Sequence, residues 1–201
     1  ICDLYSHFHP QLCSYYEWRD ALNPNRAAEC LDVLKFGMVH FHGMDTEQDP
    51  VMYVNVGNFM VKNTTIRALE HFAEVIHQEV MRLNPTRGYA DIVVDCKGFS
   101  MRTNVDLTMY QELIKIGSSC LPEITKRLFV INTPYAVRGV YNFCKGFLDE
   151  RTLDKVRFLN SDFPKLMKFI PASELPEIYG GESKYTREPY ADATDDNMCL
   201  A

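Results

Sequence analysis

The chain has 201 residues, of which 46% are hydrophobic, 12% aromatic and 24% charged. A chain of this length buries roughly 70% of its extended surface, so it needs no disulfide or metal to hold a core. The 21 Lys and Arg residues against 27 Asp and Glu give a net charge of −6, which argues against a nucleic-acid partner, because such domains usually carry a basic excess. No stretch approaches the roughly 18 apolar residues of a membrane span, and the first residues show no signal-peptide pattern.

The cysteines and histidines predict neither a disulfide framework nor a metal site. The seven cysteines are an odd number without a CxxC pair, which indicates reduced thiols. His7 and His9, and likewise His40 and His42, are two residues apart, but no further ligand accompanies either pair. The chain begins at Ile1 without Met, which indicates an excised fragment.

The first elements are short. Residues 1–35 are predicted to form helical pieces broken by Pro10 and by Asn23-Pro24-Asn25, with one short helix over residues 27–35. Residues 51–56 are rich in β-branched and aromatic side chains and lie between Asp49-Pro50 and Gly57-Asn58, which favours a strand.

The middle of the chain alternates helices and strands. Apolar residues recur every three or four positions over residues 64–83, which predicts a long amphipathic helix ended by Asn84-Pro85. Residues 92–94 and 128–131 are predicted as buried strands, with a helix over residues 105–116 between them. This alternation predicts an α/β fold with a mostly parallel sheet, and continuous apolar strands agree, because parallel sheets are covered on both faces.

A helix over residues 136–147 carries apolar side chains around much of its circumference. Such a helix is expected to be buried, or to lie over something apolar that is not protein. The last structured part is expected to include residues 156–159, a short helix over residues 163–169 and a stop at Tyr179-Gly180-Gly181. Beyond Glu182 the chain is polar and acidic, which predicts a loosely held tail.

Signals for an enzyme are weak. The sequence has no Gly-rich phosphate loop, no Gly-x-Ser-x-Gly elbow and no His-Glu-x-x-His. Asp95 ends a predicted parallel strand, where α/β enzymes place catalytic groups, and Lys97 is close by. The simpler interpretation is a strand-end turn, with Gly98 supplying the bend, and no catalytic residue is assigned.

A series of short segments resembles the CRAL-TRIO lipid-binding family and its phosphatidylinositol transfer members. They occur in the family's order over about residues 50 to 181 and include Asp95-Cys96-Lys97-Gly98, Pro122-Glu123, Ile131-Asn132-Thr133-Pro134, residues 145–149, Thr152 with Lys155, and residues 175–181. The resemblance implies a mostly parallel sheet that floors an apolar lipid pocket, flanked by helices with a mobile helical gate. Residues 1–35 would be the remnant of a helical N-terminal lobe, 36–181 the lipid-binding domain and 182–201 the acidic tail.

The resemblance also implies the site residues. Glu123, Thr152 and Lys155 would contact a phosphatidylinositol headgroup, and the chemistry fits, since a carboxylate and a hydroxyl suit inositol hydroxyls and an ammonium suits the phosphodiester. Alternatively, Glu123 favours a helix start and Lys155 is a solvated lysine. The gate would line the pocket with these side chains: Val137, Val140, Tyr141, Phe143, Cys144 and Phe147.

Departures from the family pattern bear on the cargo. Ala90 and Ile92 stand where phosphatidylcholine-binding members carry hydroxyl residues, and Met52 replaces a Tyr, with Tyr53 expected on the opposite face of the strand. These positions argue against choline-headgroup binding. Gly146 stands where the family usually has Pro, which should loosen the end of the gate.

The expected function is to bind phosphatidylinositol, with a second hydrophobic ligand also open, and to transfer or present it between membranes without catalysis. No cofactor is expected beyond the bound phospholipid, and protein partners are unknown. Residues 113–170 hold ten basic and five acidic residues, which suits transient contact with an anionic membrane and a cytoplasmic, peripherally membrane-associated protein. The alternative is a lipid-sensing or membrane-tethering module of a larger protein, without transfer activity.

Overall fold

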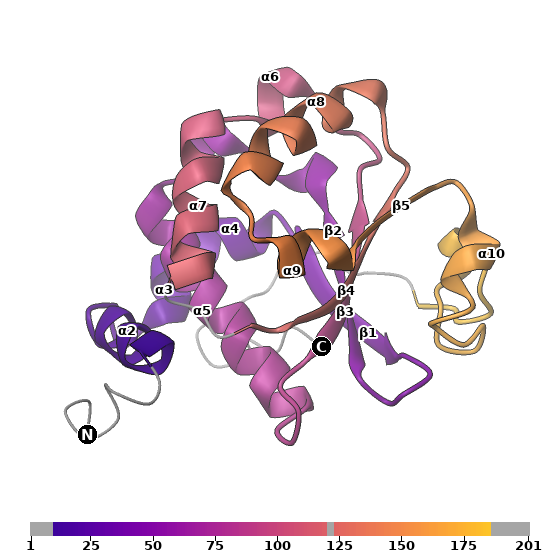
Figure 1. Ribbon diagram of the computed structural model, residues 1–201, viewed down its shortest axis with the longest axis horizontal. Helices are drawn as coiled ribbons and strands as arrows, with labels where there is room; N and C mark the ends of the chain where they lie inside the picture. Colours follow the sequence, from indigo (N-terminus) through magenta and orange to yellow (C-terminus); the bar gives the residue numbers. More distant parts are fainter. Residues whose placement is uncertain (1–9, 120–122, 186–201) are drawn as a thin grey trace.

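The computed structural model describes residues 10–119 and 123–185 (Figure 1). The α-helices are α2 (Pro10–Asp20), α3 (Arg26–Glu29), α4 (Leu31–Lys35), α5 (Ile66–Leu83), α6 (Met101–Asn104), α7 (Leu107–Ser119), α8 (Tyr135–Cys144), α9 (Glu150–Lys155) and α10 (Phe163–Leu166). The strands are β1 (Val39–Met44), β2 (Pro50–Asn55), β3 (Ala90–Asp95), β4 (Thr125–Ile131) and β5 (Val156–Asn160). Short 3-10 helices are η1 (Val56–Asn58), η2 (Val61–Asn63), η3 (Lys145–Phe147) and η4 (Glu177–Tyr179).

The five strands form one sheet in the order β1-β2-β3-β4-β5. β1 pairs antiparallel with β2, and the other three pairings are parallel. The sheet lies between helices, with α5, α7 and α8 toward one face and α10 toward the other (Figure 1). The predicted α/β class with a mostly parallel sheet flanked by helices is confirmed.

β1 was not predicted. The run Val39-His40-Phe41-His42 alternates as a strand does, and Val39 and Phe41 are buried in the core on one face while His40 stacks on Tyr53 on the other. Two histidines and Gly43 in six residues hide that period from composition alone. Once β1 pairs with β2, one of its faces packs against the core under α5 and the other does not, which explains why apolar residues and histidines alternate along it.

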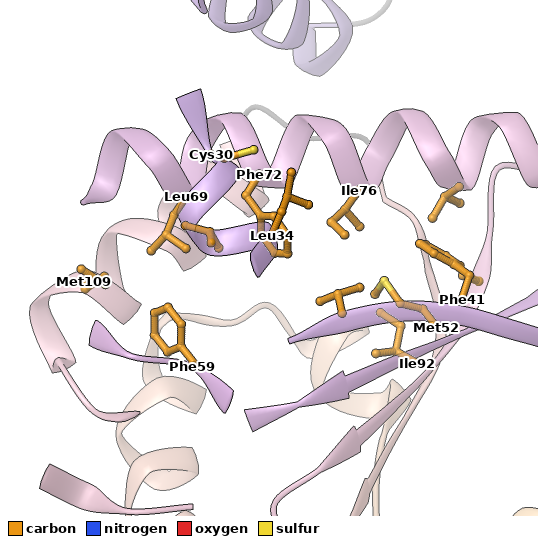
Figure 2. Close-up of a cluster of buried hydrophobic side chains, with 14 residues drawn as sticks. Cys30, Leu34, Phe41, Met52, Phe59, Leu69, Phe72, Ile76, Ile92 and Met109 are labelled. Atoms are coloured by element: carbon orange, nitrogen blue, oxygen red, sulfur yellow. The ribbon is translucent and has the colours of Figure 1, made fainter. Parts of the chain in front are cut away.

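One core lies between α5 and the sheet. Leu69, Phe72, Ile76 and Val80 follow the helical period and are all buried. Figure 2 shows the first three beneath α5, on the side of the helix that faces the sheet carrying Met52 and Ile92. Thr65 caps the helix by accepting a hydrogen bond of 3.1 Å from the Ala68 N–H, so the predicted 64–83 helix is confirmed to within two residues at its start.

A second core lies on the opposite face of the sheet. Tyr53, Phe129 and Ile131 are fully buried there against Leu166 and Ile170. Met52 and Tyr53 therefore point to opposite faces, as predicted from the two-residue period of a strand.

Several helix boundaries differ from the predictions. Pro10 begins α2, where a first-turn N–H has no helical partner to lose; the helical piece predicted before it lies outside the described residues. The predicted 27–35 helix is interrupted at Cys30, and the predicted 163–169 helix is regular only over α10. The predicted 105–116 helix corresponds to α7, with the separate short α6 before it. No helix in the described ranges is long and apolar enough to cross a membrane.

Candidate functional site

Two of the three predicted headgroup residues meet in the structure. The Lys155 ammonium forms an ion pair with the Glu123 carboxylate and donates a hydrogen bond of 2.7 Å to the Thr125 carbonyl oxygen. The topology explains the meeting: α9 leads directly into β5, and Val156 pairs with Leu128 of β4, so the end of α9 lies beside the start of β4. The two side chains are 19% and 35% exposed, so the pair is accessible from solvent.

Thr152 lies one helical turn before Lys155 on α9. Its N–H and its hydroxyl both donate to the Asp149 carboxylate, each at 2.9 Å, which makes Asp149 the N-cap of the helix. These hydrogen bonds lower the pKa of Asp149, and the bond from the Thr152 N–H has the larger effect. The Thr152 hydroxyl is therefore engaged in the cap, while its oxygen retains lone pairs for a further donor.

The predicted gate helix is amphipathic. Val137, Val140, Tyr141, Phe143 and Cys144 are half-buried on one side of α8, and Phe147 in η3 is 43% exposed. The exposed positions of α8 are Tyr135, Arg138, Gly139 and Asn142. The prediction of an apolar surface around much of the helix was therefore wrong, because these four exposed positions recur every three or four residues and form one solvent-facing side of α8. Nothing in α8 is fully buried.

The apolar side of α8 faces the carboxyl-terminal half of the sheet and α7. The Tyr141 ring packs edge-on against Phe158 of β5, with the ring centroids 4.9 Å apart. Tyr110 of α7 lies near Cys144, and burial raises the pKa of its hydroxyl to about 12. Phe143 and Phe147 contact each other with their ring centroids 5.3 Å apart.

The filling of the sheet changes along the strands. Met52, Ala90 and Ile92, beneath α5, are 5%, 0% and 7% exposed. One step toward the carboxyl ends, the next row across the sheet contains the half-buried Val54, Val94 and Phe158 and the buried Val130. Val54 and Val94 pack at the margin of the α5 core, and Phe158 packs against Tyr141 of α8, so the apolar side chains toward α8 are covered less completely than those at the centre of the α5 core.

Asp95 has a structural position. Its carboxylate accepts hydrogen bonds from the Lys97 N–H at 2.8 Å, the Asn132 side-chain amide at 2.9 Å and the Tyr179 hydroxyl at 3.0 Å. Gly98, with a φ of 76°, completes the turn in a conformation that favours glycine. These three donors hold the Asp95 carboxylate in place, in agreement with a strand-end turn.

The histidine pairs behave as packing residues where they are described. His40 is buried and stacks on Tyr53, and His42 forms a hydrogen bond of 2.8 Å with the Ser183 hydroxyl. No cluster of three or more metal-ligating side chains is found within the described residues. His7 and His9 lie outside them.

An ionic network that the sequence did not predict joins the amino ends of the parallel strands. Lys126 contacts Asp45 and Asp49 at 2.6 Å each, and Arg127 contacts Asp45 at 2.5 Å and Asp91 at 2.8 Å. The three carboxylates are fully buried. Lys126 and Arg127 are two of the ten basic residues counted for membrane attraction, and because they are mostly buried in ion pairs they are not available to attract a membrane.

Comparison with known proteins identifies relatives of this arrangement. Residues 34–181 match the CRAL/TRIO domain. A SEC14 cytosolic factor of Eremothecium gossypii is 31% identical over 166 residues, which cover 75% of this chain and 54% of that protein. The phosphatidylinositol/phosphatidylcholine transfer protein SFH7 of Arabidopsis thaliana is 28% identical over 165 residues, which cover 74% of this chain and 30% of that protein. The chain thus spans little more than half of the first relative and less than a third of the second.

Among solved structures, the crystal structure of Sfh5 superposes with a TM-score of 0.68 at 20% identity. The match covers 96% of this chain and 73% of that one. At this identity the superposition supports the fold alone.

Proposed function

The chain belongs to the CRAL/TRIO domain family, and from that membership and the site geometry we propose that it binds phosphatidylinositol and transfers or presents it between membranes. The observation that carries the proposal is the ion pair of Lys155 with Glu123 at the end of α9, three residues before the half-buried Phe158 that packs against α8. A lipid needs both features: a polar site for its headgroup and an apolar one for its chains.

The headgroup would bind at the end of α9. The Lys155 ammonium would contact the phosphodiester, and the Glu123 carboxylate would accept hydrogen bonds from inositol hydroxyls. Thr152 would contribute the free lone pairs of its hydroxyl oxygen. In the unliganded chain Glu123 neutralises Lys155; on lipid binding the phosphodiester would take that place at Lys155, and hydrogen bonds from inositol hydroxyls would hold the Glu123 carboxylate.

The acyl chains would lie between the apolar side of α8 and the sheet. Val137, Val140, Tyr141, Phe143, Cys144 and Phe147 would cover them, and opening of α8 at a membrane would admit them. Each methylene that moves from water into this layer contributes about 0.8 kcal/mol, which favours the closed state in water.

The apolar positions favour inositol over choline. Ala90, Ile92 and Met52 are buried in the core under α5 and offer no hydroxyl to a choline phosphate. We therefore propose phosphatidylinositol as the main ligand, with a second hydrophobic cargo open, and assign no catalytic step or cofactor. The protein would act in the cytosol, as the name of its cytosolic-factor relative suggests, and contact anionic membranes transiently.

Transfer of phosphatidylinositol between two vesicle populations tests the proposal. We expect the double variant Glu123→Ala/Lys155→Ala to lose at least tenfold in transfer rate. Asp162 and Lys165, an ion pair of 2.7 Å at the start of α10, provide the matched control pair, and their double alanine variant should transfer normally. Urea unfolding of both variants checks that the fold is intact.

Native mass spectrometry of the chain mixed with phosphatidylinositol vesicles separates the two functions left open by the sequence. A bound lipid together with transfer supports the proposal. A bound lipid without transfer would instead support a lipid-sensing or tethering module. An empty pocket would contradict both.

A further inference from the structure

Three segments lie together where parallel strands end. β2, β3 and β4 are neighbours in the sheet and run parallel, so the segments that follow them share one edge: residues 56–63, 96–106 and 132–142. A Cβ on Gly57 would lie 2.4 Å from the Lys97 carbonyl oxygen, and Phe99 and Pro134 line one hollow, so the three segments are in contact. Figure 1 shows α6 and α8 at this end of the molecule. We call the surface that these segments form the carboxyl-end face.

Each segment of the carboxyl-end face exposes a large apolar side chain. Met60 in the first is 41% exposed and Met101 in the second is 52% exposed. Tyr135 in the third is 92% exposed, the highest value for a large hydrophobic side chain among the described residues. A tyrosine has an apolar ring and a polar tip, which suits the boundary between water and a layer of lipid headgroups.

The charges on the same face are mostly positive. Its exposed cations are Lys62, Lys97, Arg102 and Arg138. None of these four side chains has an ion-pair partner among the described residues. The three segments contain one carboxylate, Asp106, which accepts a hydrogen bond of 3.0 Å from a backbone N–H in the first turn of α7. η4 borders the face and adds one exposed acid, Glu177, beside Ile178, which is 72% exposed. Basic side chains therefore prevail at this end of a chain whose net charge is −6.

Cations on other parts of the molecule have partners within the protein. Arg67 and Arg82 on α5 each form an ion pair with a glutamate three positions away. At the opposite edge of the sheet, Lys126 and Arg127 pair with buried aspartates. The cations of the carboxyl-end face, in contrast, are available to a partner that supplies the negative charge.

We propose that the carboxyl-end face docks on an anionic bilayer surface. The four cations would contact the anionic headgroups, to which each Lys or Arg near the surface is attracted, and Met60, Met101 and Tyr135 would lie among the headgroups. This inference rests on the proposed lipid function and gives it an orientation. Tyr135 and Arg138 lie on the exposed side of α8, so the docked membrane would contact the helix that is proposed to open.

The docking face is distinct from the charges that the sequence indicated. Of its four cations, only Arg138 lies within residues 113–170, the range in which basic residues outnumber acidic ones. The Lys155 and Glu123 pair lies at the opposite edge of the sheet, beside the start of β4. Docking and headgroup binding can therefore be altered separately.

Flotation with phosphatidylcholine vesicles, with and without phosphatidylserine, tests the proposal. We expect the unaltered chain to float with the vesicles that contain phosphatidylserine, and added salt to release it. Arg102→Gln/Arg138→Gln should weaken this binding at least about tenfold, since each cation contributes roughly fivefold. Tyr135→Ser should weaken it about fivefold, because the ring no longer leaves water.

Lys168→Gln/Lys184→Gln is the matched control, since it removes two exposed cations from the side of the sheet that carries α10. This variant should float as the unaltered chain does. If the unaltered chain binds neither kind of vesicle, or if the Arg102 and Arg138 variant binds as tightly as the control, the docking proposal is wrong. A dimer in sedimentation velocity that Tyr135→Ser abolishes, without vesicle binding, would assign the face to a second copy of the chain.

Binding of short-chain phosphatidylinositol in solution, measured by calorimetry, separates docking from the proposed function because no bilayer is present. Arg102→Gln/Arg138→Gln should bind this lipid normally while losing vesicle binding, which supports the docking face. An unaltered chain that floats with phosphatidylserine but binds no short-chain lipid would support docking and contradict the proposed lipid function. A variant that loses both properties, or that unfolds at a lower urea concentration than the control, would contradict a role confined to docking.

Discussion

The Tyr179 hydroxyl donates a hydrogen bond of 3.0 Å to the Asp95 carboxylate across 84 residues of sequence. Both residues are buried, and Asn132 donates to the other oxygen of the same carboxylate. Three of the short segments that suggested the family therefore meet at one point, at the carboxyl end of β3. Their shared role is to close the sheet against the segment that follows α10.

Tyr179→Phe should lower the free energy of unfolding by about 1–3 kcal/mol, because it leaves a buried carboxylate with one donor fewer. Urea unfolding measures the change. Tyr135→Phe, at a side chain that is 92% exposed, is the matched control and should leave stability unaltered. Equal stability of the two variants would show that the bond to Asp95 contributes nothing.

Gly181→Ala should destabilise the fold strongly. A Cβ there would lie 1.9 Å from the Leu175 carbonyl oxygen, a backbone atom that cannot rotate away. In contrast, Gly139 of α8 has no neighbour within 4 Å of such a Cβ, so Gly139→Ala should add up to about 1 kcal/mol from helix propensity. Thermal melts of the two variants should shift in opposite directions, and shifts of one sign would contradict the geometry.

Asp149→Ala should lower the urea midpoint, because it removes the N-cap of α9, whereas Asp149→Asn should retain most of the stability. Thr152→Val keeps the Thr152 N–H on that cap and should be nearly neutral for stability. If Thr152 contacts the headgroup as proposed, the valine variant will still slow phosphatidylinositol transfer. A valine variant with normal transfer would confine Thr152 to capping.

Stability should decline as the pH falls below about 6.5, the ordinary pKa of histidine. Burial lowers the pKa of His77, with Glu74 opposing the shift and Arg19 adding to it. The unfolded chain then takes up a proton that the folded chain refuses, so the stabilisation is complete above that pH and is lost below it. His77→Gln should flatten this part of the urea stability profile between pH 7 and 5; an unaltered slope would exclude His77 as a source.

Periodicity predicted the elements that bury a full stripe or a full strand. The apolar stripe of Leu69, Phe72 and Ile76 could be recognised in the sequence because all three side chains pack into the same core. The apolar runs of β3 and β4 could be recognised because both faces of the sheet are covered there. β1 was not predicted because it lies at the edge of the sheet and has histidines on one face, so its sequence lacks a continuous apolar run.

The candidate site divides in the same way. The resemblance selected Glu123, Thr152 and Lys155, and only the parallel pairing of β4 with β5 brought Glu123 to Lys155. The same pairing placed Asn132 beside Asn160, where the Asn132 N–H donates a hydrogen bond of 3.0 Å to the Asn160 carbonyl oxygen, a contact that the sequence did not predict. Lys126 and Arg127 looked like membrane-facing charges until the fold set them against Asp45 and Asp91.

By itself the sequence determined the α/β class, the long α5 and the family, because these depend on local period and on the order of short segments. Tertiary structure alone decided which charges are paired, which hydroxyls of the described residues are buried without a hydrogen-bond partner and how completely α8 covers the sheet. These properties depend on contacts between residues 32 to 84 positions apart, and the sign of a charge in the sequence does not reveal the partner that packing gives it.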